Sequence, residues 1–166
     1  MLWHGYYIDA LAVRYYDSNP DGSGIGEENF THDANFSVTA VTGNTGTVLE
    51  RYQYDPYGRL TVLEPNFTDD GDNTSDISNG TTYPGRRLDG EIGLMHYRAR
   101  YYHPTMGRFV ARDPIEYEGN DYNLYRYVSD CPIGFTNPFG QLEQPWRFIP
   151  PEQPQLPAAK SLLVCY

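Results

Sequence analysis

The sequence has 166 residues and a formal net charge of −10 with only 12 Lys plus Arg, so no broad basic surface exists for a phosphate backbone, and we expect no nucleic-acid partner. Its 39% hydrophobic residues include no run long enough to span a bilayer, so we expect no membrane insertion by this segment, and no signal sequence is visible in it. The 16 Tyr, 16 Gly and 13 Pro combine strand formers with turn formers, which is typical of many short strands.

Residues 1–64 are expected to form strands joined by tight turns. Much of this region alternates in side-chain character, with turn sequences at 19–22 (Asn-Pro-Asp-Gly) and 43–46 (Gly-Asn-Thr-Gly). The segment 38–41 is therefore predicted to pair with 47–54 in a hairpin across the second of these turns.

The rest of the chain divides by composition into three parts. Residues 65–82 hold two aromatic or aliphatic side chains among Asp, Asn, Gly, Ser and Thr, and bury too little surface to offset the entropy of ordering. A flexible acidic loop is predicted there. Residues 83–142 return to dense Tyr, Arg and Gly patterning, and residues 143–166 are expected to be an irregular, Pro-rich tail.

A short motif recurs along the chain. The sequence YDPYGRL at 54–60 is echoed by YHPTMGRF at 102–109 and, more weakly, by TNPFGQL at 136–142. In each copy Asp, His or Asn caps a turn, Pro fixes φ at the first corner, and Gly takes a positive φ before the next strand. The residues expected to make these turns are Asp55, Pro56, Gly58, Pro104, Gly107, Asn137, Pro138 and Gly140. The motif is a structural unit that needs its neighbours to bury its face.

The motif and the stretch after it resemble the RHS/YD-repeat family. Residues 52–60 resemble a YD repeat, and residues 85–140 resemble the RHS repeat-associated core. The core resemblance rests on linked pieces in the family's order: GRRLD, EIGL, YRARYY, GRF, RDPI, NLYRYV and NPFG. It implies an all-β fold in which a curved antiparallel sheet of short strands and hairpins forms part of a spiralling, hollow β-shell. The core then closes the C-terminal end of that shell, and a variable segment begins beyond it.

The resemblance also implies a role. The expected function is a structural, encapsulating segment of a large toxin-associated or cell-surface protein, secreted or displayed as part of a longer chain. Its expected partners are the upstream RHS repeats of that chain and an encapsulated C-terminal polypeptide. The strand-like sequence directly after Met1 agrees with such upstream repeats. A truncated remnant without function is a further alternative.

A second functional hypothesis is self-cleavage. In several family members the core cuts the chain once, after Asp-Pro-x-Gly-Leu, with acids resembling an aspartyl protease pair. Here Arg112 and Asp113 match the Arg-Asp-Pro element, Asp121 matches the second acid, and the scissile bond follows Leu142. Two departures stand against it, because Asn137 replaces the Asp of the motif and a glutamine precedes the final leucine. The alternative interpretation is that both acids cap turns. If the two acids do act in catalysis, the activity is expected to be single-turnover autoproteolysis at most.

The remaining polar residues predict no bound cofactor or metal. The four histidines and two cysteines lack the spacing of zinc ligands, and no disulfide is expected. Several arginines alternate with Tyr in an acidic chain, so they are expected to stack on rings and pair with acids rather than to bind an anion. These arginines are Arg98, Arg100, Arg108, Arg112 and Arg126.

Overall fold

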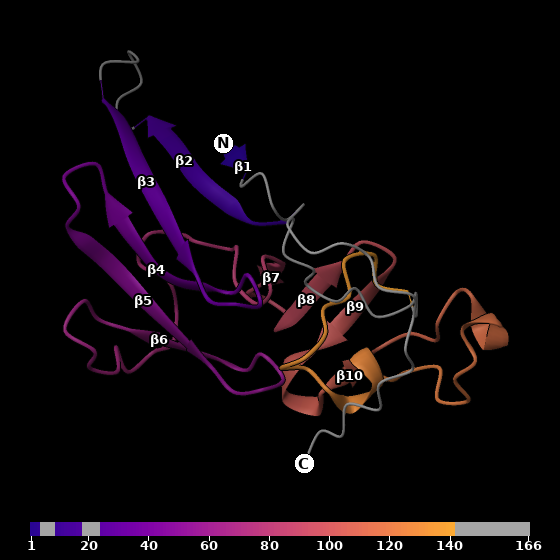
Figure 1. The fold of residues 1–166 in the computed structure, drawn as a ribbon. Coiled ribbons are helices and arrows are strands. Elements are labelled where there is room, and N and C mark those ends of the chain that lie inside the picture. The colour runs from indigo at the N-terminus through magenta and orange to yellow at the C-terminus, as the bar shows by residue number, and fades with distance from the viewer. Residues whose placement is uncertain (4–8, 18–23, 142–166) are drawn as a thin grey trace.

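The computed structural model describes residues 1–3, 9–17 and 24–141, which form two antiparallel sheets (Figure 1). The six-stranded sheet runs in chain order through β1 (Leu2–Trp3), β2 (Leu11–Asp17), β3 (Ile25–His32), β4 (Val38–Gly43), β5 (Val48–Tyr54) and β6 (Leu60–Leu63). The four-stranded sheet comprises β7 (Arg87–Asp89), β8 (Leu94–Tyr97), β9 (Arg100–His103) and β10 (Arg108–Phe109), also in chain order. Three short 3-10 helices, η1 (Pro104–Met106), η2 (Glu116–Gly119) and η3 (Val128–Asp130), lie among the later connections. The prediction of an all-β, antiparallel fold is confirmed.

One five-residue turn connects strands repeatedly. It occupies residues 33–37, 43–47, 55–59, 64–68 and 82–86, and in each the first residue donates its N–H to the fifth carbonyl and accepts the N–H of the fourth. The fourth residue always has a positive φ, between 63° and 85°. This is a type I turn closed by a bulge, which suits the twist of paired strands. The predicted hairpin is confirmed, since Ala40 pairs with Arg51 across the second of these turns. The predicted turn at 19–22 lies outside the described residues.

The YDPYGRL turn shows how its sequence is used. Asp55 Oδ1 accepts the N–H groups of Tyr57 and Arg59, each at 2.9 Å, and Gly58 adopts a φ of 85°. In the second copy Pro104 begins η1, and Gly107 ends it in the left-handed region with a φ of 64°. The predicted cap by His103 is wrong, because this residue makes no side-chain capping bond. Side-chain capping and a positive-φ residue together satisfy the backbone groups that the reversal leaves without a strand partner.

The two sheets have separate cores. One face of the six-stranded sheet buries a cluster of aliphatic and aromatic side chains: Leu11, Phe30, Val38, Val41, Tyr52 and Val62. The four-stranded sheet buries a mainly aromatic cluster: Tyr83, Met95, Tyr97, Tyr102, Phe109 and Tyr127. In the second cluster the hydroxyls of Tyr97 and Tyr127 lie 2.9 Å apart, and burial raises the pKa of Tyr97 well above its usual value. Paired hydroxyls allow tyrosines to serve as core residues without leaving a buried polar group unsatisfied.

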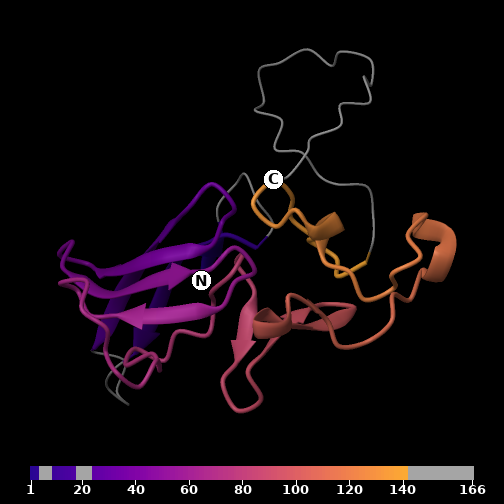
Figure 2. The same cartoon turned by 90° about the horizontal axis from the view of Figure 1, so that it is seen from below.

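Tyrosine hydroxyls also join the two sheets, which lie side by side (Figure 2). Tyr102 donates to the carbonyl of Tyr57 at 2.8 Å, and Tyr83 donates to the carbonyl of Pro56 at 3.0 Å. The first copy of the repeated turn is thus bound directly by the four-stranded sheet.

Residues 65–82 connect the sheets without a named strand. Short polar side chains fold the backbone locally, as where Asp69 Oδ1 accepts the N–H of Gly71 and Asp72 Oδ1 accepts the N–H of Thr74. Isolated bridges tie the ends of the segment to its neighbours, Leu63 to Asp69 and Thr81 to Arg87. The predicted mobility of this loop stays a prediction, while its hydrogen bonds show how polar residues can order a segment that buries little apolar surface.

Candidate functional site: the arginine anchor of the 137–140 turn

Three arginines of the four-stranded sheet converge on the third copy of the repeated turn. Arg86 directly precedes β7, Arg98 stands in the turn between β8 and β9, and Arg100 begins β9. Each donates to backbone carbonyls of residues 137–140. We call these three side chains the arginine anchor.

The first half of the anchor binds the start of the turn. Arg86 Nη2 lies 2.5 Å from the carbonyl oxygen of Pro138 and 3.3 Å from that of Asn137, and Arg98 Nη1 also donates to the Pro138 carbonyl. Asp9, just before β2, pairs with both arginines, at 2.8 Å from Arg86 and 2.5 Å from Arg98. Burial raises the pKa of the Asp9 carboxyl, and the two guanidinium groups oppose that rise. A residue that directly precedes the first sheet's β2 therefore pairs with both arginines that bind the start of the turn.

Arg100 binds the end of the turn. Its Nε donates to the carbonyl of Gly140, its Nη1 donates to the carbonyl of Leu124 at 3.1 Å, and its Nη2 lies 2.8 Å from Asp113 Oδ2. The guanidinium stacks over the Phe109 ring at 3.6 Å, and the side chains of Arg100 and Asp113 are each 1% exposed. Burial lowers the pKa of Arg100 to about 10, and the neighbouring carboxylate opposes the fall. The guanidinium therefore stays protonated at neutral pH and joins three segments that are distant in sequence.

The turn itself is closed by Asn137 and Gly140. Asn137 is 7% exposed, and its Oδ1 accepts the N–H of Gly140 at 2.8 Å. Gly140 has a φ of 69°, and a Cβ placed there would lie 1.9 Å from the carbonyl oxygen of Tyr97. The glycine is thus required twice, for its conformation and for the close approach of two backbones.

The residues predicted for self-cleavage occupy different environments. Asp113 is buried in the ion pair with Arg100, and its Oδ1 accepts the N–H of Ile115. Asp121 caps a turn through the N–H of Asn123 and lies 3.4 Å from Arg126 Nε. Both acids thus make capping bonds, and each pairs with a different arginine. The third predicted residue, Arg112, is exposed, and the predicted scissile bond after Leu142 lies outside the described residues.

The expected use of the arginines is confirmed at four positions. Arg98 stacks over Phe139 and Arg100 over Phe109, and Arg108 stacks over Tyr125. Arg126 pairs with acids instead, Asp121 and Asp130. The sequence did not single out Arg86 or Asp9. Their only signal is the charge of Asp9 between apolar residues and the place of Arg86 in the GRRLD piece.

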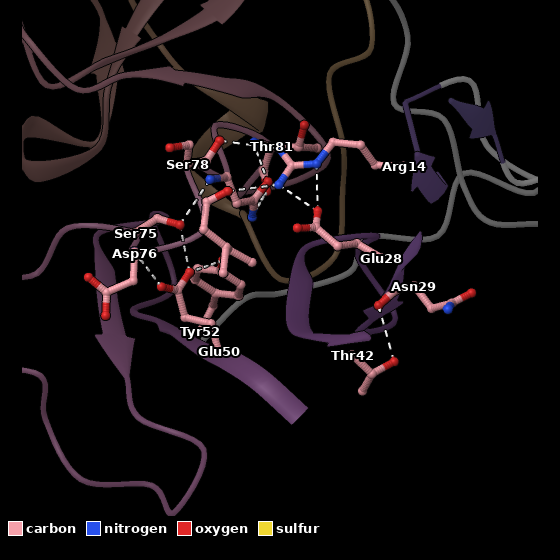
Figure 3. Close-up of polar contacts among 12 residues, drawn as sticks. Arg14, Glu28, Asn29, Thr42, Glu50, Tyr52, Ser75, Asp76, Ser78 and Thr81 are labelled. Atoms are coloured by element: carbon pink, nitrogen blue, oxygen red, sulfur yellow. Dashed lines mark hydrogen bonds and ion pairs between the residues drawn. The ribbon is translucent and has the colours of Figure 1, made fainter. Parts of the chain in front are cut away.

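A second polar network fixes the loop that covers the core of the six-stranded sheet (Figure 3). Glu50, buried on β5, accepts hydrogen bonds from the hydroxyls of Tyr52 and Ser75 and from the N–H of Asp76 at 2.8 Å. Burial and the bond to Glu50 raise the pKa of the Tyr52 hydroxyl far above its usual value. The carboxylate thus acts as an acceptor for a loop that has no strand partner.

Arg14 holds the same loop from β2. It pairs with Glu28 on β3 through Nε at 2.6 Å and donates to the carbonyls of Ile77 at 2.8 Å and Ser78 at 3.2 Å. Residues 75–78 are therefore fixed by one buried acid and one arginine of the sheet beneath them.

Replacing Glu50 by Ala is expected to release residues 75–76, because a hydrogen bond to a charged group contributes about 1.5–3 kcal/mol. Amide exchange of Asp76 should then accelerate by roughly tenfold or more, since 1.4 kcal/mol corresponds to a factor of ten. The matched control is Glu64→Ala, an exposed acid at the end of β6. Equal exchange at Asp76 in both variants would contradict the assigned role of Glu50.

Within residues 1–3, 9–17 and 24–141 no group of three or more His, Cys, Asp or Glu is arranged to hold a metal ion, and no helix is long and apolar enough to cross a membrane. An open, polar cavity of about 330 Å³ lies between the first two copies of the repeated turn and includes Asp55, Gly107 and Arg126 in its lining.

Cys131 is buried and disulfide-bonded, so the expectation of no disulfide is wrong for this residue. Cys165, the other cysteine of the sequence, lies outside the described residues.

The all-β, antiparallel fold of the chain resembles part of the RHS shell in Tc toxins. It matches the crystal structure of TcdB2-TccC3 with a TM-score of 0.63 and 25% sequence identity, over 77% of this chain and 6% of the TcdB2-TccC3 chain. No family model matches the sequence.

The sequence relatives include RHS-associated toxin proteins. The chain is 34% identical over 138 residues to the tRNA3(Ser)-specific nuclease WapA of Bacillus spizizenii, which is 81% of this chain and 5% of WapA. It is 35% identical over 112 residues to the probable deoxyribonuclease RhsA of Dickeya dadantii, which is 65% of this chain and 7% of RhsA. The chain thus corresponds to a small part of each of these long relatives.

Proposed function

We propose that residues 83–142 are the RHS repeat-associated core of a larger secreted or cell-surface protein, and that with the repeat strands of residues 1–64 they form the C-terminal end of an encapsulating β-shell. The observation that carries this proposal is the arginine anchor, which fixes residues 137–140 against the four-stranded sheet through their carbonyls. The anchor sets the position and direction in which the polypeptide continues toward Leu142. Preceding RHS repeats are the partner of the sheets, and a C-terminal polypeptide is the material enclosed.

Protease protection tests this function. The chain is expressed with its natural preceding repeats and following polypeptide, and digested with a nonspecific protease. The following polypeptide should survive intact in the assembled protein and be degraded when expressed alone. Digestion at the same rate in both forms would contradict the proposal.

Self-cleavage is a second candidate, and one observation favours it. Arg100 joins Asp113, the predicted catalytic acid, to the carbonyl of Gly140, which lies two residues before Leu142. The same ion pair also gives Asp113 a structural role, because the buried pair joins residue 113 to the start of β9. The described geometry therefore supports a structural segment first.

Intact mass of the same long protein separates the two candidates. With Asn137 in place of the motif's aspartate, we expect both the native chain and the Asp113→Asn variant to remain uncut. A break after Leu142 that Asp113→Asn abolishes would instead establish single-turnover autoproteolysis. Asn137→Asp is the matched test of the departure from the motif, because aspartate can accept the same N–H bond from Gly140.

A further inference from the structure

The outer edge of β6 is occupied by a side chain. Asn73 Oδ1 accepts the N–H of Val62 at 2.7 Å, and Asn73 Nδ2 donates to the carbonyl of Leu60 at 3.1 Å. These two backbone groups point away from β5, so a neighbouring strand would use them for pairing. One amide therefore takes the place of the N–H and C=O that such a strand would offer.

The amide is held in this position by its own segment. Asn73 has a φ of 59°, a left-handed conformation that asparagine tolerates better than most residues, and its N–H donates to Asp70 Oδ1 at 2.9 Å. Further along the edge, the N–H of Glu64 donates to the carbonyl of Thr68, and Leu63 bridges to Asp69. The edge of β6 is thus satisfied by the segment that follows it in the chain.

The opposite edge of the sheet is different. β1 is the outermost strand there, paired to β2, and Leu2 and Trp3 are 56% and 53% exposed (Figure 1). A sheet edge is a template for another strand unless it is covered, and main-chain pairing at an edge is a common mode of recognition.

We propose that Asn73 closes the six-stranded sheet at β6, so that a further strand is added only beside β1. The strand that fits there is an extended strand of a preceding RHS repeat, and this choice of partner rests on the proposed function. The six-stranded sheet can then be extended at one edge only, so strands of preceding repeats are added in a single order.

Asn73→Gly tests the closure in the 166-residue chain. Glycine keeps the left-handed backbone and removes only the amide. Amide exchange of Val62 should accelerate by roughly tenfold, as expected for one lost hydrogen bond of about 1.4 kcal/mol. Light scattering at rising concentration should show self-association beyond that of the native chain, because the edge of β6 is then open to a second copy.

The matched control is Asn120→Gly, which makes the same substitution at another left-handed asparagine, at the end of η2. It should change neither Val62 exchange nor association. If the glycine variant does not fold, Asn73→Asp is the second variant: it keeps the acceptor for Val62 and loses the donor to Leu60, so Val62 exchange should stay near the native rate while self-association rises less than in the glycine variant.

Unchanged exchange at Val62 in the glycine variant would overturn the inference, and so would faster exchange without self-association, because the amide would then be a local bond that excludes no strand. Neither readout uses the preceding repeats. If the protein fails the protease-protection test but its Asn73→Gly variant self-associates, the proposed shell function is rejected and the closure of the β6 edge by Asn73 stands.

Discussion

Arg100→Met is expected to lower the free energy of unfolding by about 3–5 kcal/mol, the usual cost of removing one partner from a buried ion pair. Methionine retains much of the aliphatic volume, but it leaves the Asp113 carboxylate, 1% exposed, without its cation. The substitution also removes the donors to the carbonyls of Leu124 and Gly140. Chemical denaturation of the native and variant chains measures the effect.

Arg126→Met is the control for this prediction. Its guanidinium is 35% exposed and pairs with Asp121 and Asp130 at 3.4 and 3.3 Å, so its loss should cost no more than about 1 kcal/mol. Adding Asp113→Asn to Arg100→Met should recover part of the lost stability, because the unpaired buried charge disappears. If the Arg100 and Arg126 substitutions lower the free energy of unfolding equally, the buried Arg100–Asp113 pair contributes no more to stability than an exposed pair.

Gly140→Ala is the second substitution with a large expected effect, about 2–5 kcal/mol. A non-glycine residue at positive φ costs about 1–2 kcal/mol, and relieving a close contact by backbone movement costs about 1–3 kcal/mol more. The contact is severe, because the new Cβ would lie 1.9 Å from the carbonyl oxygen of Tyr97. Faster protease cleavage around residues 137–141 should accompany the loss in stability.

Gly46→Ala separates the two causes. Gly46 has a φ of 79° in the hairpin between β4 and β5, and a Cβ there meets nothing within 4 Å. Its substitution should therefore cost only the conformational part, about 1–2 kcal/mol. A Gly140 variant no less stable than the Gly46 variant would mean that the 137–140 turn is free to move away from Tyr97.

Local sequence signals predicted the hairpins well. The hairpin from 38 to 54 follows from alternation and from glycines at 43 and 46, and the predicted pairing of its two strands is confirmed. The same signals missed two equivalent turns, because Phe36 and Phe67 occupy the left-handed position where a glycine or asparagine is expected. There the strand pairing on either side imposes the turn against local preference.

The arginine anchor was only partly predictable. The Asn-Pro-Phe-Gly sequence indicated a turn, and the alternation of Arg with Tyr indicated stacking and ion pairs. Neither signal shows that Arg86 reaches residues 137 and 138, or that Asp9 pairs with it from the other sheet. Contacts between residues so distant in sequence depend on how the two sheets pack, which local patterns do not encode.

The chemistry of the anchor has a consequence for how such a scaffold can diversify. All three arginines donate to backbone carbonyl oxygens of the turn, which every amino acid carries, and Arg98 also stacks over the Phe139 ring. These hydrogen bonds therefore set no requirement on the side chains of residues that follow the turn. Under the proposed function, a different C-terminal polypeptide could follow it without changes to the three arginines.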